Sequence, residues 1–177
     1  MKVFFIFSIV LIFSKNVLSQ ELPKLKISNS GVEYIVIKAD SLTSQILYDK
    51  TLNWIKVYYK NPDKVLQSNI TNEKIRISAF KENAWWYFPM GIKTSYHMDY
   101  NIEISFKDGK YKIDFYIGQF YTTDYAKTLF SYSSFFKSNG DVKNIYSDAI
   151  ISIEETMNSI ILNHFNYING KIENDNW

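Results

Sequence analysis

Residues 96–117 read YHMDYNIEISFKDGKYKIDFYI, and this stretch decides the fold. Apolar and aromatic side chains alternate with polar ones on both sides of the pair Asp108-Gly109. A period of two residues predicts strands that bury one face each. Asp-Gly between two such strands is typical of a two-residue type I′ turn. The stretch therefore predicts a long antiparallel hairpin.

The two-residue turn also fixes the register of the hairpin. It places Phe106 opposite Tyr111 and Ile102 opposite Phe115, so that apolar side chains face apolar side chains along the whole hairpin. A slip by one residue would move every one of these side chains to the other face of the sheet. The matching pattern therefore supports this register.

Outside the hairpin, the pattern predicts two helices and three further strands. Helical faces recur over 42–60 and over 142–168, and Asn169-Gly170 is a stop signal for the second. Strands are expected at 32–39, 64–70 and 74–80, a connection at 82–91 and weak helical character over 121–140. This order implies an α+β domain, in which helices cover one face of an antiparallel sheet. The other face carries polar side chains and can contact water.

The start of the chain has the features of a secretory signal peptide. Lys2 gives a basic start, residues 3–13 are almost wholly apolar, and Ser19 fits a cleavage site before Gln20. The apolar run is too short for a membrane span, which needs about 20 residues, and no second stretch could span after cleavage. We therefore expect an exported protein, periplasmic or secreted. Its expected parts are a signal peptide at 1–19, a mature N-terminal lead at 20–31, an α+β domain at 32–120 and a C-terminal helical segment at 121–177 packed on the same domain.

Composition excludes several classes of function. Hydrophobic residues make up 46% of the chain and charged residues 21%, which is typical of a globular domain. The chain has no cysteine and two histidines, so we predict no disulfide, no metal site and no cofactor. Without Lys2 and Lys15, 18 basic and 18 acidic residues remain, and Arg76 is the only arginine. Nucleic-acid binding usually needs a basic, arginine-bearing face, so we expect no nucleic-acid partner.

Two stretches resemble a known family. One is Leu47-Tyr48 followed by Trp54-Ile55 and Tyr58, and the other is the hairpin segment YNIEISFKDGKYK at 100–112. Together they resemble the domain of unknown function 4468, over roughly residues 33–120. The resemblance implies a TATA-binding-protein-like fold and an exported protein of a Gram-negative bacterium. It carries over no activity and no catalytic residues, and the fold name by itself implies no DNA binding.

Four consecutive aromatic residues form the first candidate site. Trp85, Trp86, Tyr87 and Phe88, here called the aromatic run, could offer an exposed platform for a sugar or a protein partner. They could equally close one end of the core. Four consecutive side chains on an extended segment cannot all point inward, so we expect at least one to be exposed.

A pair of carboxylates forms the second candidate site. The hairpin register sets Glu103 opposite Asp114, with their Cβ atoms about 5 Å apart. Carboxylates this close can share a proton and perform acid–base chemistry. The alternative is a solvated sheet face on which Lys112 neutralises the pair. His164 lies on the apolar face of the last helix, and we interpret it as a core histidine with one satisfied hydrogen bond.

These observations lead to two functional hypotheses. The first is an exported, non-enzymatic domain that binds a protein or a glycan in the cell envelope, for which the aromatic run is the candidate site. The alternative is an envelope hydrolase that uses Glu103 and Asp114. A concave pocket around that pair would favour the hydrolase.

Overall fold

A computed structural model of the chain describes residues 22–172, so the expected signal peptide at 1–19 lies outside the described residues. Within 22–172, no helix combines the length and the apolarity needed to cross a membrane. The elements in chain order are β1 (Ile27–Ser28), β2 (Gly31–Val32), β3 (Ile35–Lys38), α1 (Ser44–Tyr58), α2 (Pro62–Val65), β4 (Leu66–Ile70), β5 (Lys74–Tyr87), η1 (Pro89–Gly91), β6 (Thr94–Lys107), β7 (Lys110–Tyr121), η2 (Tyr132–Phe135), η3 (Asn144–Tyr146) and α3 (Ser147–Ile168).

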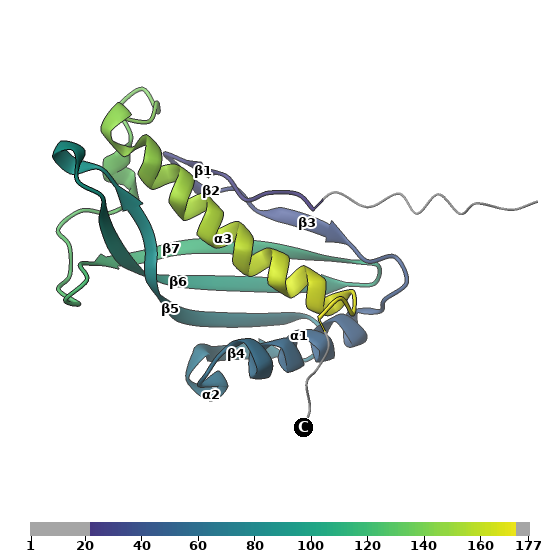
Figure 1. The fold of residues 1–177 in the computed structure, drawn as a ribbon. Helices are drawn as coiled ribbons and strands as arrows, with labels where there is room; N and C mark the ends of the chain where they lie inside the picture. The colour runs from purple at the N-terminus through teal and green to yellow at the C-terminus, as the bar shows by residue number, and fades with distance from the viewer. Residues whose placement is uncertain (1–21, 173–177) are drawn as a thin grey trace, which may run out of the picture.

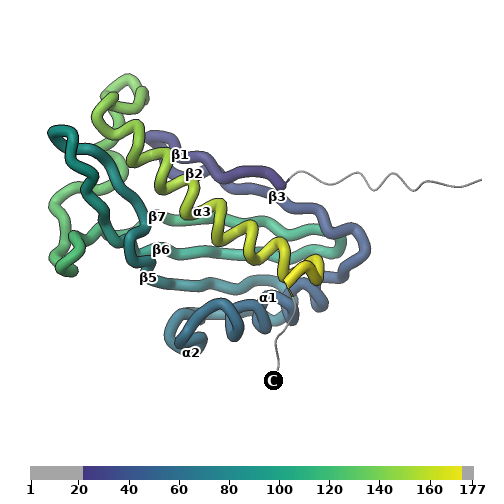
Figure 2. Tube along the Cα trace, viewed as in Figure 1, coloured from purple at the N-terminus to yellow at the C-terminus, as the bar shows by residue number. Residues whose placement is uncertain are grey.

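The main sheet has five antiparallel strands in the order β3-β7-β6-β5-β4. The helix α3 runs diagonally across one face of this sheet, and α1 lies on the same side near its lower end (Figures 1 and 2). The apolar positions of the strands point into this covered face, where Ile77, Ile104 and Phe115 are almost fully buried. The predicted α+β fold, with helices on one face of an antiparallel sheet, is confirmed.

The predicted hairpin register is confirmed from the turn as far as Tyr100, which lies opposite Ile117. A bulge between Met98 and Tyr100 then shifts the pairing by one residue, so His97 faces Tyr121. At the bulge, the backbone of Asp99 passes so close to Gly118 that a Cβ atom there would lie 2.8 Å from the Asp99 carbonyl oxygen. Glycine at 118 therefore permits the irregularity that turns the end of β6.

The helix α1 begins with a side-chain cap and buries one face. Thr43 is its N-cap, and the Thr43 hydroxyl accepts a hydrogen bond from the Ile46 N–H at 3.3 Å. The helix ends at Tyr58, ahead of Pro62. Trp54, which is 1% exposed, packs edge-on against the His164 ring at 4.8 Å between ring centroids. This contact joins α1 to α3 over the sheet.

Two of the predicted local structures are wrong. The expected connection at 82–91 is largely strand, because β5 continues to Tyr87 after a bulge at which Asn83 has a positive φ of 47°. The segment 121–140 is mostly irregular, and its one helical turn is η2. The spacing of its aromatic residues does not reflect a helical face. Single rings of the segment insert into the core, as Phe135 does where it stacks on Phe120.

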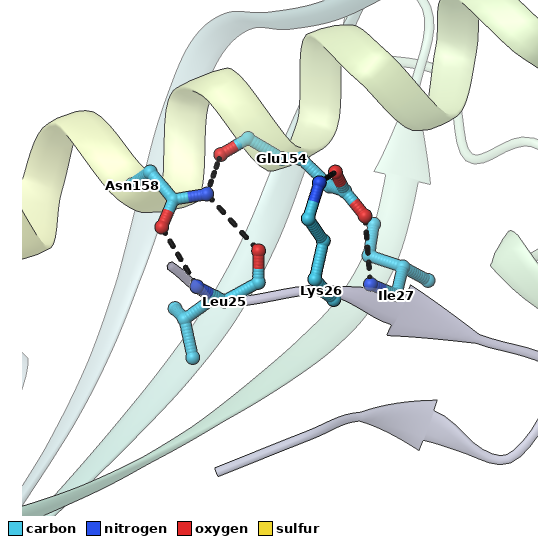
Figure 3. A network of polar contacts seen from close by, with 5 residues as sticks. All are labelled: Leu25, Lys26, Ile27, Glu154 and Asn158. Carbon is cyan, nitrogen blue, oxygen red and sulfur yellow. Dashed lines mark hydrogen bonds and ion pairs between the residues drawn. The ribbon is translucent and has the colours of Figure 1, made fainter. Parts of the chain in front are cut away.

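The segment before β3 is held against α3 by side chains that bond to its backbone (Figure 3). The Leu25 N–H donates to Asn158 Oδ1 at 2.8 Å, and the Asn158 amide nitrogen donates to the Leu25 carbonyl at 3.1 Å. The Ile27 N–H donates to Glu154 Oε1 at 2.9 Å, while Lys26 forms an ion pair with the other Glu154 oxygen. Leu25 and Ile27, two residues of the expected lead at 20–31, are therefore part of the core.

His164 is a buried core residue. Its Nε2 atom lies 2.9 Å from the Thr51 hydroxyl, and its other ring nitrogen has no hydrogen-bond partner among the described residues. Burial lowers the pKa of His164 from its ordinary 6.5 to about 3. The ring is therefore neutral at physiological pH, and the interpretation of His164 as a core histidine with one hydrogen bond agrees with the structure.

This burial makes stability depend on pH. Because the His164 pKa is lower in the folded protein, the unfolded chain takes up the proton first as the pH falls below 6.5. Stability from this group is complete above that pH and falls by about 1.4 kcal/mol per unit below it. Urea melts at about pH 7.5 and 4.5 should differ by about 2–3 kcal/mol more in the wild type than in His164→Gln. Equal differences in the two proteins would contradict the buried, neutral state of the ring.

Candidate functional site

The four members of the aromatic run have different surroundings. Trp85 is 0% exposed and stacks on Tyr96 at 4.4 Å between ring centroids. Trp86 and Tyr87 are half-buried, and Phe88 is 43% exposed. The run therefore forms no common platform, because Trp85 closes the core and Phe88 is its most accessible ring.

Trp86 is held in place through both its backbone and its ring. Its backbone N–H donates to the Ser152 hydroxyl of α3 at 3.1 Å, and that hydroxyl donates back to the Trp86 carbonyl at 3.1 Å. Its ring lies 4.3 Å from Lys93 Nζ and edge-on to Phe88. This half of the run thus anchors β5 to α3 and leaves a small aromatic edge at the surface.

The carboxylate pair is present in the predicted register but is surrounded by cations. Glu103 lies opposite Asp114. Lys74 Nζ is 2.8 Å from Glu103 Oε1, and Arg76 Nε is 3.9 Å from Glu103 Oε2. Lys112 Nζ is 2.7 Å from Asp114 Oδ2. Each carboxylate is thus charge-paired, as in the solvated-face interpretation.

These groups belong to the sheet face opposite the two long helices, here called the outer face. The registers place on it Val36 and Lys38; Lys110, Lys112, Asp114 and Tyr116; Asp99, Asn101, Glu103, Ser105 and Lys107; and Lys74, Arg76, Ser78 and Phe80. Tyr34, which precedes β3, adjoins this face, because Lys112 Nζ lies 5.3 Å from the centre of its ring. Three of its aromatic rings are substantially exposed: Tyr34 at 62%, Tyr116 at 47% and Phe80 at 40%. The outer face therefore offers exposed aromatic rings among hydrogen-bonding and charged groups.

An open hollow of about 480 Å³ lies on the outer face beside the β6 bulge. We call it the polar hollow, and five of its lining residues are Ser78, Phe80, Asp99, Asn101 and Gln119. Lys64 and Val65 of α2 also line it. The hollow combines a flat ring with side chains that donate and accept hydrogen bonds.

The polar hollow is held in shape by neighbouring aromatic side chains. The Tyr121 hydroxyl donates to Asp99 Oδ2 at 2.6 Å, and this bond raises the pKa of Tyr121. Phe80 stacks on Tyr125 at 6.0 Å, and the Tyr125 hydroxyl donates to Glu82 at 2.7 Å. Asp99 and Phe80 are therefore positioned before any ligand arrives.

The charged side chains that line the polar hollow are Asp99 and Lys64. Among its described lining residues, Asp99 is the one carboxylate. Glycosidic hydrolysis usually needs two such groups flanking the bond. Within residues 22–172, no three side chains of the His, Asp and Glu types gather as a metal centre would need.

Residues 34–120 match the family described as a domain of unknown function (DUF4468) with TBP-like fold. The chain contains a DUF4468 domain. The matched range agrees with the stretch over which the sequence resembles that family, so this prediction is confirmed. No curated protein matches the chain.

Two crystal structures share the fold of this chain. A DUF4468 family protein from Bacteroides ovatus ATCC 8483 is 11% identical, with a TM-score of 0.59 over 87% of this chain and 93% of that one. A TBP-like protein from Parabacteroides distasonis ATCC 8503 is 15% identical, with a TM-score of 0.57 over 77% of this chain and 91% of that one. At these identities the likeness shows the fold alone.

Sequence reasoning missed the polar hollow of the DUF4468 domain. Its residues come from three strands, and the bulges in β5 and β6 decide which of them meet. One signal was present, since Gly118 interrupts a strand rich in aromatic residues, and glycine in a strand often marks a bulge or a close approach. That signal could have placed the irregularity beside Asp99.

Substitutions at the two ends of the aromatic run should have different effects on the free energy of unfolding. Trp85→Ala removes a fully buried ring and should lower the free energy of unfolding by about 3–5 kcal/mol. Phe88→Ala changes an exposed side chain and should alter it by no more than about 0.5 kcal/mol. Denaturant melts of the two variants give both values. Similar losses in both proteins would show that the run acts as one packed unit.

Proposed function

We propose that this chain is an exported, non-enzymatic binding domain of the cell envelope and that its outer face binds a glycan. The observation that carries the proposal is the polar hollow, where Phe80 lies beside Ser78, Asp99 and Asn101. A sugar ring has C–H faces that pack on an aromatic side chain and hydroxyls that both donate and accept hydrogen bonds. The hollow offers partners of both kinds.

A protein partner is less well supported by this surface. The buried centre of a protein interface is usually apolar and depleted of charge. The outer face instead alternates charged and polar side chains along its strands, and Glu103, Asp114, Lys74 and Arg76 lie near its middle. Such a surface favours a ligand that brings its own hydrogen-bonding groups.

The hydrolase alternative also has weaker support. A general acid needs a carboxyl group free to give up a proton to the leaving group. Glu103 has Lys74 and Arg76 beside it, and Asp114 has Lys112. Neither carboxylate lines the polar hollow. We therefore propose that Glu103 and Asp114 form charge pairs within the outer face and take no part in catalysis.

The export half of the proposal rests on the sequence at the N-terminus. A basic start, an apolar run and Ser19 before Gln20 support a cleaved signal peptide. Protein recovered from the envelope or medium of its host should begin at Gln20, as read by N-terminal sequencing or mass spectrometry. Exported material that retains Met1 would contradict the signal assignment.

The binding half can be tested with two phenylalanines of similar exposure. Phe80 is 40% exposed within the polar hollow, and Phe88 is 43% exposed outside it. On an array of envelope glycans, followed by calorimetry with the best binder, Phe80→Ala should weaken binding about two- to twelvefold, since an aromatic contact contributes roughly 0.5–1.5 kcal/mol beyond its buried area. Phe88→Ala should bind as the wild type does.

The matched pair also separates the candidate sites. If Phe88→Ala loses affinity and Phe80→Ala does not, the binding surface is the exposed end of the aromatic run and the polar hollow is excluded. If no envelope glycan binds while an envelope protein is retained by the wild type, the glycan assignment is overturned.

A further inference from the structure

A second cavity lies on the outer face at the end nearest the hairpin turn. Its volume is about 440 Å³, within the range of ligand pockets. We call it the lysine cavity, and its lining includes Tyr34, Val36, Ser105, Lys107, Lys110 and Lys112. Its lining residues come from the edge strand β3 with the preceding Tyr34, and from β7 and β6, so the cavity lies at the β3 side of the sheet.

The lysines of this cavity stand in an unfavourable arrangement. The strand registers set Lys38 opposite Lys110, and Lys110 opposite Lys107, which makes a row of three like charges across β3, β7 and β6. Like charges directly opposite one another destabilise a sheet. Among residues 22–172, neither Lys107 nor Lys110 forms an ion pair, whereas Lys112 is paired with Asp114. Positive charge is therefore left uncompensated at one place.

Two acidic residues, Asp40 and Asp108, lie at the hairpin turn, and neither forms an ion pair with a lysine among residues 22–172. The side chain of Asp108 accepts a hydrogen bond from the Ser44 N–H at 2.8 Å, at the start of α1. It thus stabilises the helix N-terminus, where a negative charge is favourable. Within residues 22–172 the lysine row therefore has Asp40 in its neighbourhood but no carboxylate at ion-pair distance.

One wall of the cavity is apolar. Tyr34 is 62% exposed and Val36 is 45% exposed, and both belong to the edge of the sheet at β3. Lys112 Nζ lies 5.3 Å from the centre of the Tyr34 ring, so the cationic rim and the aromatic wall adjoin. A bare inorganic anion would use the rim and leave the wall exposed. A ligand that has both an anionic group and a ring with C–H faces would use both.

We propose that the lysine cavity binds an acidic sugar, a pyranose that carries a carboxylate or a phosphate group. The anionic group lies among Lys107, Lys110 and Lys112, and the ring packs on Tyr34 and Val36. This site is distinct from the polar hollow, because Ser105 and Asn101 lie four residues apart along β6, roughly 13 Å. The proposal stands whether or not the polar hollow binds a neutral glycan.

Four small probes test the class of ligand by calorimetry and by NMR of the purified protein. They are glucuronate, glucose 6-phosphate, glucose and inorganic phosphate. We expect the two acidic sugars to bind with shifts at Tyr34 and at the lysine side chains, more tightly than phosphate and much more tightly than glucose. The tighter of the two identifies the acidic group. Binding should weaken as salt is added, since the lysines are partly exposed.

Several outcomes would overturn the proposal. Phosphate binding as tightly as glucose 6-phosphate would show that the apolar wall takes no part. Glucose binding as tightly as glucuronate would remove the role of the lysines. Tighter binding of a DNA duplex than of any acidic sugar would make this face a polyanion surface, and absence of binding by either acidic sugar would remove the site.

Variants locate the binding in the cavity. Lys107→Gln with Lys110→Gln should weaken acidic-sugar binding about tenfold, because each partly exposed charge contact contributes a few-fold. It should not lower the thermal midpoint, since it removes like-charge repulsion. The matched control is Lys56→Gln with Lys137→Gln, which changes two exposed lysines on α1 and in the loop before α3. An equal loss in that control would show general attraction and overturn the assignment to the cavity.

Discussion

Burial of one face of the hairpin sheet under α3 and α1 is the constraint on which the rest of the structure depends. The inward side chains of β6 and β7 are apolar, and α3 crosses them diagonally (Figure 1). Because Trp54 of α1 packs on His164 of α3, the two helices share one buried layer. The same alternation sets the side chains of the opposite face, which the two long helices leave uncovered.

The fold could be predicted from the sequence where a local rule and the core agree. In the hairpin, the Asp108-Gly109 turn and the period of two require the same register, and the structure has it as far as Tyr100. Prediction failed where distant contacts override the local pattern. Residues 82–87 look like a connection, but Trp85 enters a cluster built by Tyr96, Phe120 and Phe135, and this packing continues β5 to Tyr87.

Distant contacts also limit what could be predicted of the candidate sites. The register alone places Glu103 opposite Asp114, but whether such a pair is reactive depends on neighbours from β5 and β7, and these are Lys74, Arg76 and Lys112. The N-terminal segment is a further case. The side chains of Asn158 and Glu154 form hydrogen bonds with its backbone (Figure 3). Such bonds cannot be predicted from the residue types of the segment itself.

The two hollows of the outer face differ in the contacts they can make, and their separation is fixed because β6 runs through both. One offers Asp99 and Asn101 beside Phe80, and the other offers lysines beside Tyr34. Hydrogen bonds and exposed charge contacts are individually weak in water, so each hollow alone favours modest affinity. A polymer that carries neutral and acidic units at a matching spacing would engage both at once, and its second contact would form at a high effective concentration. Rigid spacing on one strand thus favours an extended ligand over a small one, because only an extended ligand gains from the second hollow.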